Sequence, residues 1–385
     1  SNPNTGSNFV INPFELDSKI NDDLLNNNTS FRESSNATWK AKMEENINAG
    51  YANYFHKFSD KFDMNAGIRL EKYNRQTLYK EIGSFNSDYK EINADELYFI
   101  PSINMKYTMS EMANLRFAGS STYTKPVIME SFPIQIVNPD GTVYQGNPYL
   151  VNSKNLNFEL KYEIFPTQKE MFATSLFAKK IDNPIERTFL PNSGSTITSF
   201  LNSDQAILYG LEAEMILDLG RLSSSMDDLS WGLNTTLMQT NVNVPDTVTG
   251  PNGNVVQSIE THKDRELQGA SKWMVNSDLK YQFDLNKNWS NTLSLVYSVF
   301  GKRIYSVGTA GIDHIYELPV SKLDFIINSK ISEHIDLKLS ADNILNPKTK
   351  LEVGENSKDN YIESSRIVQD YKKGVGFSLN LSYTF

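Results

Sequence analysis

The sequence predicts an all-β chain that forms a large antiparallel transmembrane β-barrel. Three observations lead to this prediction: apolar and polar residues alternate along many segments, short turns alternate with long loops, and aromatic residues make up 11% of the chain. A period of two puts apolar side chains on one face of a strand and polar side chains on the other. Repeated over long segments, this pattern is typical of a barrel wall between lipid and water.

The clearest strand ends the chain. Apolar residues occupy every second position from 375 to 385, and Gly, Ser, Asn and Thr fill the positions between them. The same alternation predicts strands at 62–71, 103–108, 156–164, 211–218, 278–283, 293–299, 323–330 and 335–342. By this rule the chain has about thirteen strands, or about fourteen if one more closes the barrel. Residues 43–385 form the predicted barrel, and residues 1–42 are a poorly defined N-terminal segment or a preceding loop or strand.

The connections alternate in length. Short polar turns lie near residues 59–60, 110–111, 166–168, 286–288 and 332–334, whereas long segments lie at about 75–96, 125–153, 184–206, 242–271, 302–317 and 347–370. Outer-membrane barrels have short periplasmic turns and long extracellular loops. The sequence therefore predicts that the last strand ends in the periplasm. The odd strand count suggests that the barrel starts upstream of this sequence.

Composition excludes several classes of protein. The chain has 385 residues, a net charge of -9 and no cysteine. An acidic chain has no broad basic surface for phosphates, so nucleic acid is not an expected partner. Disulfides and thiolate chemistry are absent, and no apolar run is long enough for a transmembrane helix. The N-terminal residues carry neither an initiator methionine nor a signal core, which suggests a processed chain or a piece of a longer one.

A soluble β-sandwich is the plain structural alternative. Strands in such folds usually run about five to six residues, and the segments found here are longer. Trp231, Trp273 and Trp289 lie near predicted strand ends, where the interfacial girdles of a membrane barrel would place aromatic residues. We therefore prefer the barrel.

Seven short motifs, in order along the chain, resemble the barrel of TonB-dependent outer-membrane receptors in the Bacteroidota branch. They are Gly67-Ile68-Arg69-Leu70-Glu71, Ile100-Pro101-Ser102-Ile103-Asn104, Asn114-Leu115-Arg116-Phe117, Gly146-Asn147-Pro148-Tyr149-Leu150, Tyr209-Gly210-Leu211-Glu212, Asp342-Asn343-Ile344-Leu345-Asn346 and Leu381-Ser382-Tyr383-Thr384-Phe385. The last motif looks like a C-terminal barrel-assembly signal, carried by Leu381, Tyr383 and Phe385.

The resemblance implies more than this sequence contains. Members of that family are similar in having an N-terminal plug domain, a TonB-contacting segment and a barrel of about 22 strands. We expect this chain to be the C-terminal part of such a barrel, since an arc with two unpaired edges in lipid would be costly and needs more strands to close. The alternative is closure with a fourteenth strand into a smaller barrel.

Candidate chemistry is sparse. The four histidines, His56, His262, His314 and His334, show no spacing with a carboxylate or serine that marks a catalytic site. No metal ligand set or cofactor motif is predicted, because Asn138–Thr142 and Pro251–Asn254 read as turns. Charged residues on the polar strand faces predict a barrel interior that contains water. These residues are Arg69, Glu71, Arg116, Glu159, Lys161, Glu163, Glu212, Glu214, Lys338 and Asp342.

Loop aromatics are the candidate contacts for a ligand or a lid. They include Tyr123, Phe132, Tyr144, Tyr149, Tyr305 and Tyr316, which could stack on a ligand or simply pack their own loop. The resemblance implies uptake of a bulky nutrient, such as an iron chelate, cobalamin, a glycan or a peptide, with no enzymatic activity. Its implied location is the outer membrane of a Gram-negative bacterium, and its implied partners are lipid, a plug, the TonB system and a possible surface lipoprotein lid. A passive porin-like channel and a docking barrel for a surface or secretion complex remain alternatives, and an enzyme is a third.

Overall fold

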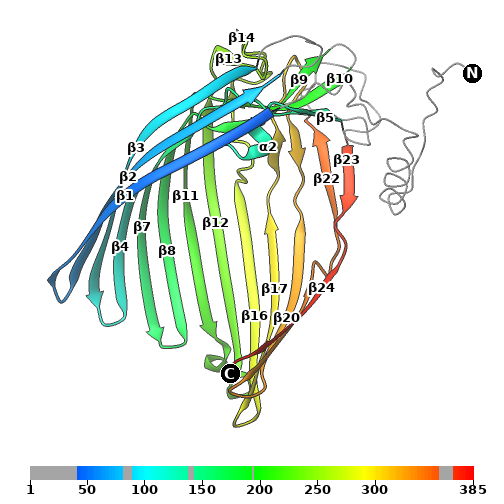
Figure 1. The fold of residues 1–385 in the computed structure, drawn as a ribbon. Helices are drawn as coiled ribbons and strands as arrows, with labels where there is room; N and C mark the ends of the chain where they lie inside the picture. Colours follow the sequence, from blue (N-terminus) through cyan, green and yellow to red (C-terminus); the bar gives the residue numbers. More distant parts are fainter. Residues whose placement is uncertain (1–40, 81–88, 138–142, 193–194, 355–366) are drawn as a thin grey trace, which may run out of the picture.

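Long β-strands wind into one curved sheet in the computed structural model of this chain (Figure 1). The structure describes residues 41–80, 89–137, 143–192, 195–354 and 367–385. One sheet has fourteen strands, of which β15 (Asp264–Arg265) pairs only with β12, off the main path. The other thirteen follow one another as antiparallel neighbours in chain order. The prediction of an all-β antiparallel fold with thirteen to fourteen strands is therefore confirmed.

The strands of the main path are β1 (Ala41–Ser59), β2 (Phe62–Tyr79), β3 (Lys90–Ser110), β4 (Ala113–Thr124), β7 (Ser153–Thr167), β8 (Glu170–Asp182), β11 (Gln205–Asp218), β12 (Leu229–Asn243), β16 (Trp273–Asn286), β17 (Trp289–Phe300), β20 (Ser321–Lys330), β21 (Ile335–Asp342) and β24 (Gly376–Tyr383). The longest, β3, has 21 residues. Strands of this length exceed those of an ordinary sandwich.

Turn lengths separate the two ends of the sheet. The short turns between β1 and β2, β3 and β4, and the later strand pairs all lie at the bottom of Figure 1, where the chain also ends. The connection from β11 to β12 holds two short 3-10 turns, η2 (Leu219–Arg221) and η3 (Ser224–Met226). The long connections lie at the top. We call these the short-turn end and the long-loop end.

The long connections have secondary structure of their own. They contain helix α2 (Ile128–Ser131) and three small sheets. The first sheet is β5 (Gln135–Val137), β6 (Val143–Gln145), β10 (Ser195–Asn202) and β9 (Ile185–Asn192); the second is β13 (Thr247–Thr249) and β14 (Val255–Gln257); the third is β18 (Arg303–Ser306), β19 (Ile315–Glu317), β22 (Lys348–Val353) and β23 (Ile367–Lys372). The sequence pattern predicted only loops at these positions.

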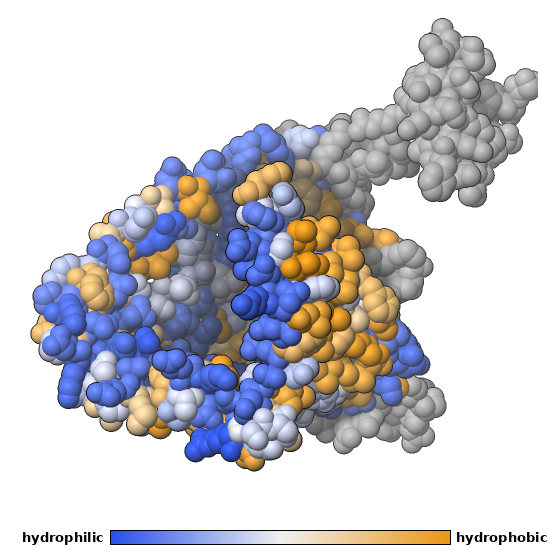
Figure 2. All heavy atoms as spheres, turned by 90° about the horizontal axis from the view of Figure 1, so that it is seen from below, coloured by the Kyte–Doolittle hydropathy of each residue, from blue (hydrophilic) through white to orange (hydrophobic). Residues whose placement is uncertain are grey.

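The two faces of the main sheet differ as the alternation requires. On β24, Phe377 is 82% exposed and Leu379 is 69% exposed, which is what lipid-facing side chains show when no lipid is present. Seen from below in Figure 2, hydrophilic residues surround the central hollow and hydrophobic residues gather on the outer surface at the right. The polar face is therefore the inner face.

The sheet splits near the long-loop end. Strands β3 and β4 pair only up to Ser102 opposite Ser120, whereas β4 continues beside β7 to Thr124 opposite Ser153. Pro101, which has no N–H to donate, lies one residue beyond the last β3–β4 pair. Above this point β1, β2 and β3 form one leaf of the sheet, and β4 with the later strands forms the other.

The two edges of the main sheet are open among the described residues. Strand β1 pairs only with β2, and β24 pairs only with β21. Within the same part of the chain, no helix is long and apolar enough to cross a membrane.

Candidate functional site

The Gly146-Asn147-Pro148 motif holds the long loops together. Asn147 is 1% exposed, and its side-chain amide donates hydrogen bonds to the backbone oxygens of Phe200 and Thr249, each at 2.9 Å. Its side-chain oxygen accepts from the backbone N–H of Tyr149 at 3.0 Å. A Cβ on Gly146 would lie 2.2 Å from the backbone oxygen of Phe132. This motif therefore joins the β4–β7 connection to the β8–β11 and β12–β16 connections.

Residues of strand β2 form hydrogen bonds with the β4–β7 connection and so hold it against the barrel wall. Arg75, 5% exposed, donates to the backbone oxygens of Leu150 at 2.9 Å and Pro148 at 3.5 Å. The hydroxyls of Tyr79 and Tyr149 lie 3.0 Å apart. The candidate ligand residue Tyr149 is thus engaged with β2, and its ring also approaches Gly253 in the β13–β14 turn.

Tyr123 was predicted to be a loop residue, but it lies near the end of strand β4, in an aromatic cluster at the split of the sheet. By strand parity it shares a face with Leu115 and Phe117, yet its ring stacks on Tyr98 of β3, with the ring centroids 3.9 Å apart. Its hydroxyl donates to the carboxylate of Glu71, which lies 6% exposed. Because the two leaves separate above Ser102, the outer face of β4 can contact the inner face of β3 here.

A second aromatic group surrounds Arg187 of β9. The guanidinium lies 4.5 Å from the ring centroid of Tyr305 and 5.9 Å from that of Phe200, distances at which a cation is attracted to an aromatic face. Tyr144 packs on Phe200, with the ring centroids 5.5 Å apart. Burial raises the pKa of Tyr144 to about 12, so its hydroxyl keeps its proton. The structure thus brings the candidate residues Tyr144 and Tyr305 to one cluster.

Phe132, another candidate contact, follows helix α2. It lines a largely apolar cavity of about 880 Å³ together with the start of β1 and α2 residues such as Ile128 and Met129. Ile128 is 68% exposed and Met129 is 47% exposed. Exposed apolar side chains at the rim distinguish this cavity from the polar one described below.

Arg265 of β15 is the centre of a buried ion cluster. It is 6% exposed and donates to both carboxylate oxygens of Glu186, each at 2.8 Å, and to Glu260 at 2.8 Å. Burial alone would lower the pKa of Arg265, but the bonds from Glu186 and Glu260 outweigh it and raise that pKa. Burial raises the pKa of Glu260, against the opposing effect of Arg265. The cluster joins β9, β15 and the segment before β15.

A polar cavity of about 610 Å³ opens beside this cluster, and we call it the loop cavity. It lies between the long-loop end of β12, β15, β18 and β19, and its lining includes His262, Asp313, His314 and Tyr316. His262 Nε2 is 3.0 Å from Asp313 Oδ1. The backbone N–H of Gly308 donates to His314 Nδ1 at 2.9 Å. Sequence reasoning found no spacing that would join these two histidines.

The electrostatics of His314 follow from its position. Only 2% of the residue is exposed, and burial lowers its pKa to about 4, with Arg265 acting in the same direction and Asp313 opposing it. Because Nδ1 accepts a hydrogen bond, the proton of the neutral ring is on Nε2. Nε2 has no hydrogen-bond partner among the described residues. Tyr316 in the same cavity has its pKa raised to about 12 by burial, and Lys302 lies 4.1 Å from its ring centroid.

Charged residues on the inner face form ion pairs, both within one strand and between strands. Arg69 contacts Glu71, Arg116 lies 2.7 Å from Glu163, and Lys161 lies 2.9 Å from Glu214. Arg116–Glu163 joins β4 to β7 and Lys161–Glu214 joins β7 to β11, whereas Arg69 and Glu71 both lie on β2. Asn234 donates to Glu212 at 2.6 Å and extends this polar inner face to β12.

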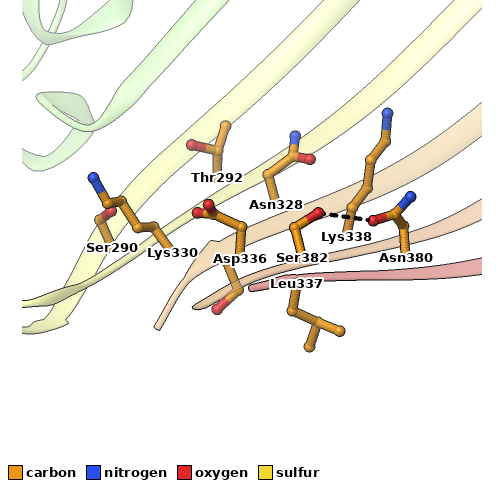
Figure 3. A pocket seen from close by; sticks show the side chains of 10 residues that line it. Ser290, Thr292, Asn328, Lys330, Asp336, Leu337, Lys338, Asn380 and Ser382 are labelled. Atoms are coloured by element: carbon orange, nitrogen blue, oxygen red, sulfur yellow. Dashed lines mark hydrogen bonds between the residues drawn. The ribbon is translucent and has the colours of Figure 1, made fainter. Parts of the chain in front are cut away.

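At the short-turn end, the inner face holds a polar pocket of about 450 Å³ formed by β17, β20, β21 and β24. Figure 3 shows Lys330, Asp336 and Lys338 on the same side of the ribbon, while Leu337 points to the opposite side. Asn380 and Ser382 of β24 contact each other at 3.2 Å. The pocket shows the predicted alternation residue by residue.

The remaining motif positions are explained by backbone geometry. A Cβ on Gly67 would lie 2.9 Å from Ser102 Oγ, and one on Gly210 would lie 2.2 Å from the backbone oxygen of Leu237. Asn343 and Asn346 have positive φ angles of 59° and 42°, a region that asparagine tolerates better than most residues. Both bind Gly374: Asn343 Nδ2 donates to its oxygen at 2.6 Å, and its N–H donates to Asn346 Oδ1 at 3.1 Å.

The residues of the proposed assembly signal lie at alternate positions at the end of the chain: Leu381 and Tyr383 on β24, and Phe385 two residues beyond it. Leu381 is 66% exposed, Tyr383 is 59% exposed and Phe385 is fully exposed. Among the described residues, no group of three histidine, aspartate or glutamate side chains is placed to hold a metal ion.

Together these features define a class: a membrane-spanning antiparallel β-barrel of the outer-membrane type, with an apolar outer face, a polar inner face and folded long loops at one end. The chain belongs to the outer membrane protein beta-barrel family, whose model matches residues 4–383. It is located in the outer membrane of Gram-negative bacteria.

Solved structures support the same fold at low sequence identity. The ferric yersiniabactin uptake receptor FyuA from Yersinia pestis matches with a TM-score of 0.55 and 13% identity over 90% of this chain and 46% of that receptor. The copper transporter OprC matches with a TM-score of 0.60 and 11% identity over 89% of this chain and 48% of the transporter. The ferric-catecholate import receptor Fiu from K12 E. coli matches with a TM-score of 0.51 and 11% identity over 80% of this chain and 42% of the receptor.

The sheet is thus similar to the barrels of TonB-dependent receptors, and this chain spans about half the length of the structures it matches. No curated protein matches the sequence. Barrels of this family are typically non-enzymatic transporters.

Proposed function

We propose that this chain is the C-terminal part of the barrel of a TonB-dependent receptor of the Bacteroidota type, which imports a bulky nutrient and catalyses no reaction. The main support is the sheet, in which thirteen consecutive antiparallel strands leave both edges open among the described residues. The chain matches only 46% of FyuA and 48% of OprC. Unpaired strand edges are not tolerated in lipid, so further strands would complete the barrel.

In this mechanism the chain contributes the wall and the ligand-binding face. The polar inner face, with ion pairs such as Arg116–Glu163, suits water or a polar plug domain rather than lipid. A plug would close the lumen, and the TonB system would pull on it to release the ligand inward. No covalent step is required of this chain.

The folded loops are the proposed ligand-binding or lid-contacting face. The proposed contacts remain Tyr123, Phe132, Tyr144, Tyr149, Tyr305 and Tyr316. Most of these rings already have partners within the protein, as Tyr123 does with Tyr98 and Tyr305 with Arg187. Tyr316, on the loop cavity, and Phe132, on the apolar cavity, line open space and are the first positions to test. A surface lipoprotein is the proposed lid.

The deciding experiment is the intact mass and N-terminal sequence of the protein extracted from its native outer membrane. The receptor proposal predicts a mass well above the 43.7 kDa of this sequence, with a plug domain upstream. A native mass near 43.7 kDa would refute it. In that case, ion conductance in planar bilayers would test the passive channel, and co-purification of a stable surface partner would test the docking barrel.

A second measurement tests energy coupling. Cells with and without a functional TonB system would be compared for nutrient-dependent growth and for accumulation of the labelled nutrient. The proposal expects accumulation that depends on both the receptor and TonB. Accumulation that persists without TonB would favour a passive channel.

A further inference from the structure

We propose that the loop cavity binds a neutral, polyhydroxylated ligand of the saccharide class, through hydrogen bonds that His314 Nε2, Lys272 and Lys302 donate and that the neighbouring carboxylates accept. This inference deepens the proposed uptake function and rests on it for the fate of the ligand. Its support lies in the charge balance of the cavity, in an unpartnered donor, and in its place at the long-loop end.

The charges that line the cavity balance. The three carboxylates and three cations are Asp264, Glu266, Asp313, Arg265, Lys272 and Lys302. Most already have partners: Lys272 lies 2.6 Å from Glu266, and Arg265 lies 2.8 Å from Glu186. A multiply charged anion would meet three carboxylates here, and a multiply charged cation would meet three basic groups. A neutral ligand avoids both penalties.

Hydroxyl groups suit this mixture of paired charges. Each hydroxyl both donates and accepts a hydrogen bond. It can therefore accept from an ammonium and donate to the adjacent carboxylate without breaking their pair. Asn241, which donates to Asp264 at 2.8 Å, adds an amide at the exposed side of the cavity. Hydrogen bonds to ionised groups are stronger than those between neutral groups, so several of them would fix the orientation of a saccharide.

His314 supplies the second, independent observation. The ring lines the cavity and is buried, with its Nδ1 occupied by the Gly308 N–H and its Nε2 without a partner among the described residues. A buried donor without a partner is rare in native proteins. Because Nε2 carries the proton, it can donate to a ligand oxygen but cannot coordinate a metal. The lowered pKa of His314 keeps the ring in this neutral form.

The size and position of the cavity fit this ligand class. A volume of about 610 Å³ lies within the range of about 300–1,000 Å³ found for small-molecule sites. The cavity is formed by the long-loop end of the barrel, the end that faces the cell exterior in outer-membrane barrels. Tyr316 adds an aromatic side chain to the wall.

The test is a binding assay on the full-length protein, purified in detergent from its native membrane. The probes are malto-, xylo- and manno-oligosaccharides, uronate-containing oligosaccharides, tripeptides and a ferric catecholate, each titrated by calorimetry. We expect at least one neutral oligosaccharide to bind more tightly than about 1 mM and more tightly than its uronate counterpart. The inference is overturned if no neutral oligosaccharide binds, or if a charged probe binds and the neutral ones do not.

Two variants tie binding to this cavity. In His314→Asn, the side-chain oxygen can still accept the Gly308 N–H, while the Nε2 donor is lost. In Asn241→Leu, a polar group at the exposed side is removed. Each is expected to weaken binding by about tenfold, the usual size for loss of one hydrogen bond to a ligand. His334→Asn, in the short-turn loop between β20 and β21, is the matched control and should leave binding unchanged. Unchanged affinity in both cavity variants would overturn the assignment.

Failure of this inference and failure of the uptake proposal are distinguishable. TonB-dependent uptake of a ferric catecholate without saccharide binding would refute the inference and leave the receptor function intact. Saccharide binding that depends on His314, together with uptake that does not depend on TonB, would support the cavity assignment and refute the receptor mechanism.

Discussion

Replacing Arg265 with methionine is expected to weaken the contacts between the long loops and so to lower their local stability. The change removes five hydrogen bonds: two to Glu186 at 2.8 Å each, one to Glu260 at 2.8 Å, one to Ser203 at 3.3 Å and one to the backbone oxygen of Glu266 at 3.3 Å. It also leaves two buried carboxylates without their cation. Glu186 is 3% exposed, and the side chain of Glu260 is 8% exposed. Removing one member of a buried ion cluster costs about 3–5 kcal/mol, mostly because the remaining charges stay buried.

Hydrogen exchange measured by mass spectrometry would detect this loss. A local opening free energy lowered by about 3–5 kcal/mol corresponds to exchange about 10² to 10⁴ times faster. The faster exchange should be confined to peptides that contain residues 185–188, 203 and 260–266. The triple variant Arg265→Met, Glu186→Gln, Glu260→Gln leaves no unpaired charge, so it should recover most of the protection.

The control is Lys263→Met in the same loop. Its partner, Asp246, lies at 3.4 Å, and the two side chains are 67% and 89% exposed. Such exposed pairs contribute little, so exchange should match that of the wild type. Wild-type exchange in Arg265→Met would refute the reasoning. A triple variant as labile as the single one would show that lost packing, rather than buried charge, dominates.

Three further predictions concern other parts of the chain. Gly146→Ala should expose the β4–β7 connection to limited proteolysis, because its Cβ would lie 2.2 Å from the Phe132 oxygen; the control Gly50→Ala has nothing within 4 Å, and equal cleavage of the two variants would contradict this. His314 is neutral in the fold, with a pKa of about 4 against an ordinary value near 6.5. Its contribution to loop stability is therefore complete above about pH 6.5 and is lost as the pH falls toward 4. Exchange of the β18–β19 region, corrected for intrinsic rates, should accelerate over that window, and less so in His314→Asn. The charged and titratable groups that face His314 are Arg265, Asp313, His262 and Glu186; equal acceleration in both proteins would show that His314 is not the group responsible. Phe385→Asp should reduce the amount of heat-modifiable barrel in isolated outer membranes if the C-terminal signal works as proposed, and an unchanged amount would count against that role.

The strands could be predicted from the sequence because alternation is a local property. Side chains of a strand point to opposite faces whatever lies beside it, so Phe377, Leu379 and Leu381 had to share a face wherever β24 paired. Turn chemistry fixed the short connections in the same local way. The same alternation restricts the register of strand pairing, because a slip of one residue would move every apolar side chain to the face that contacts water.

Neither the place of Tyr123 in strand β4 nor its contact with Tyr98 was predicted, since the sequence was interpreted as a loop at this position. Parity places it with Leu115 and Phe117, and its contact with Tyr98 exists only because the sheet divides beyond Ser102 and Ser120. Pro101 is visible in the sequence, but nothing local shows that two leaves of one sheet will overlap beyond it.

The site depended still more on tertiary structure. Arg265 and Glu186 are 79 positions apart, and Asn147 meets backbone oxygens 53 and 102 positions away. Asn147 belonged to a recognised motif, but the motif did not predict the partners of its side chain. Nothing in the sequence marked Arg265 as the centre of an ion cluster, because a single arginine in a loop is common. His262 and His314 line one cavity because the β12–β16 and β17–β20 connections fold together at the long-loop end.

The sequence by itself determined the barrel: its faces, its strand order and which end carries the loops, because each depends on the backbone of a strand and its nearest turn. Only the tertiary structure decided how the long connections fasten to one another and where they leave a cavity. Those contacts join residues far apart along the chain, and their free energy comes from burying charges and polar groups together, which no local pattern records.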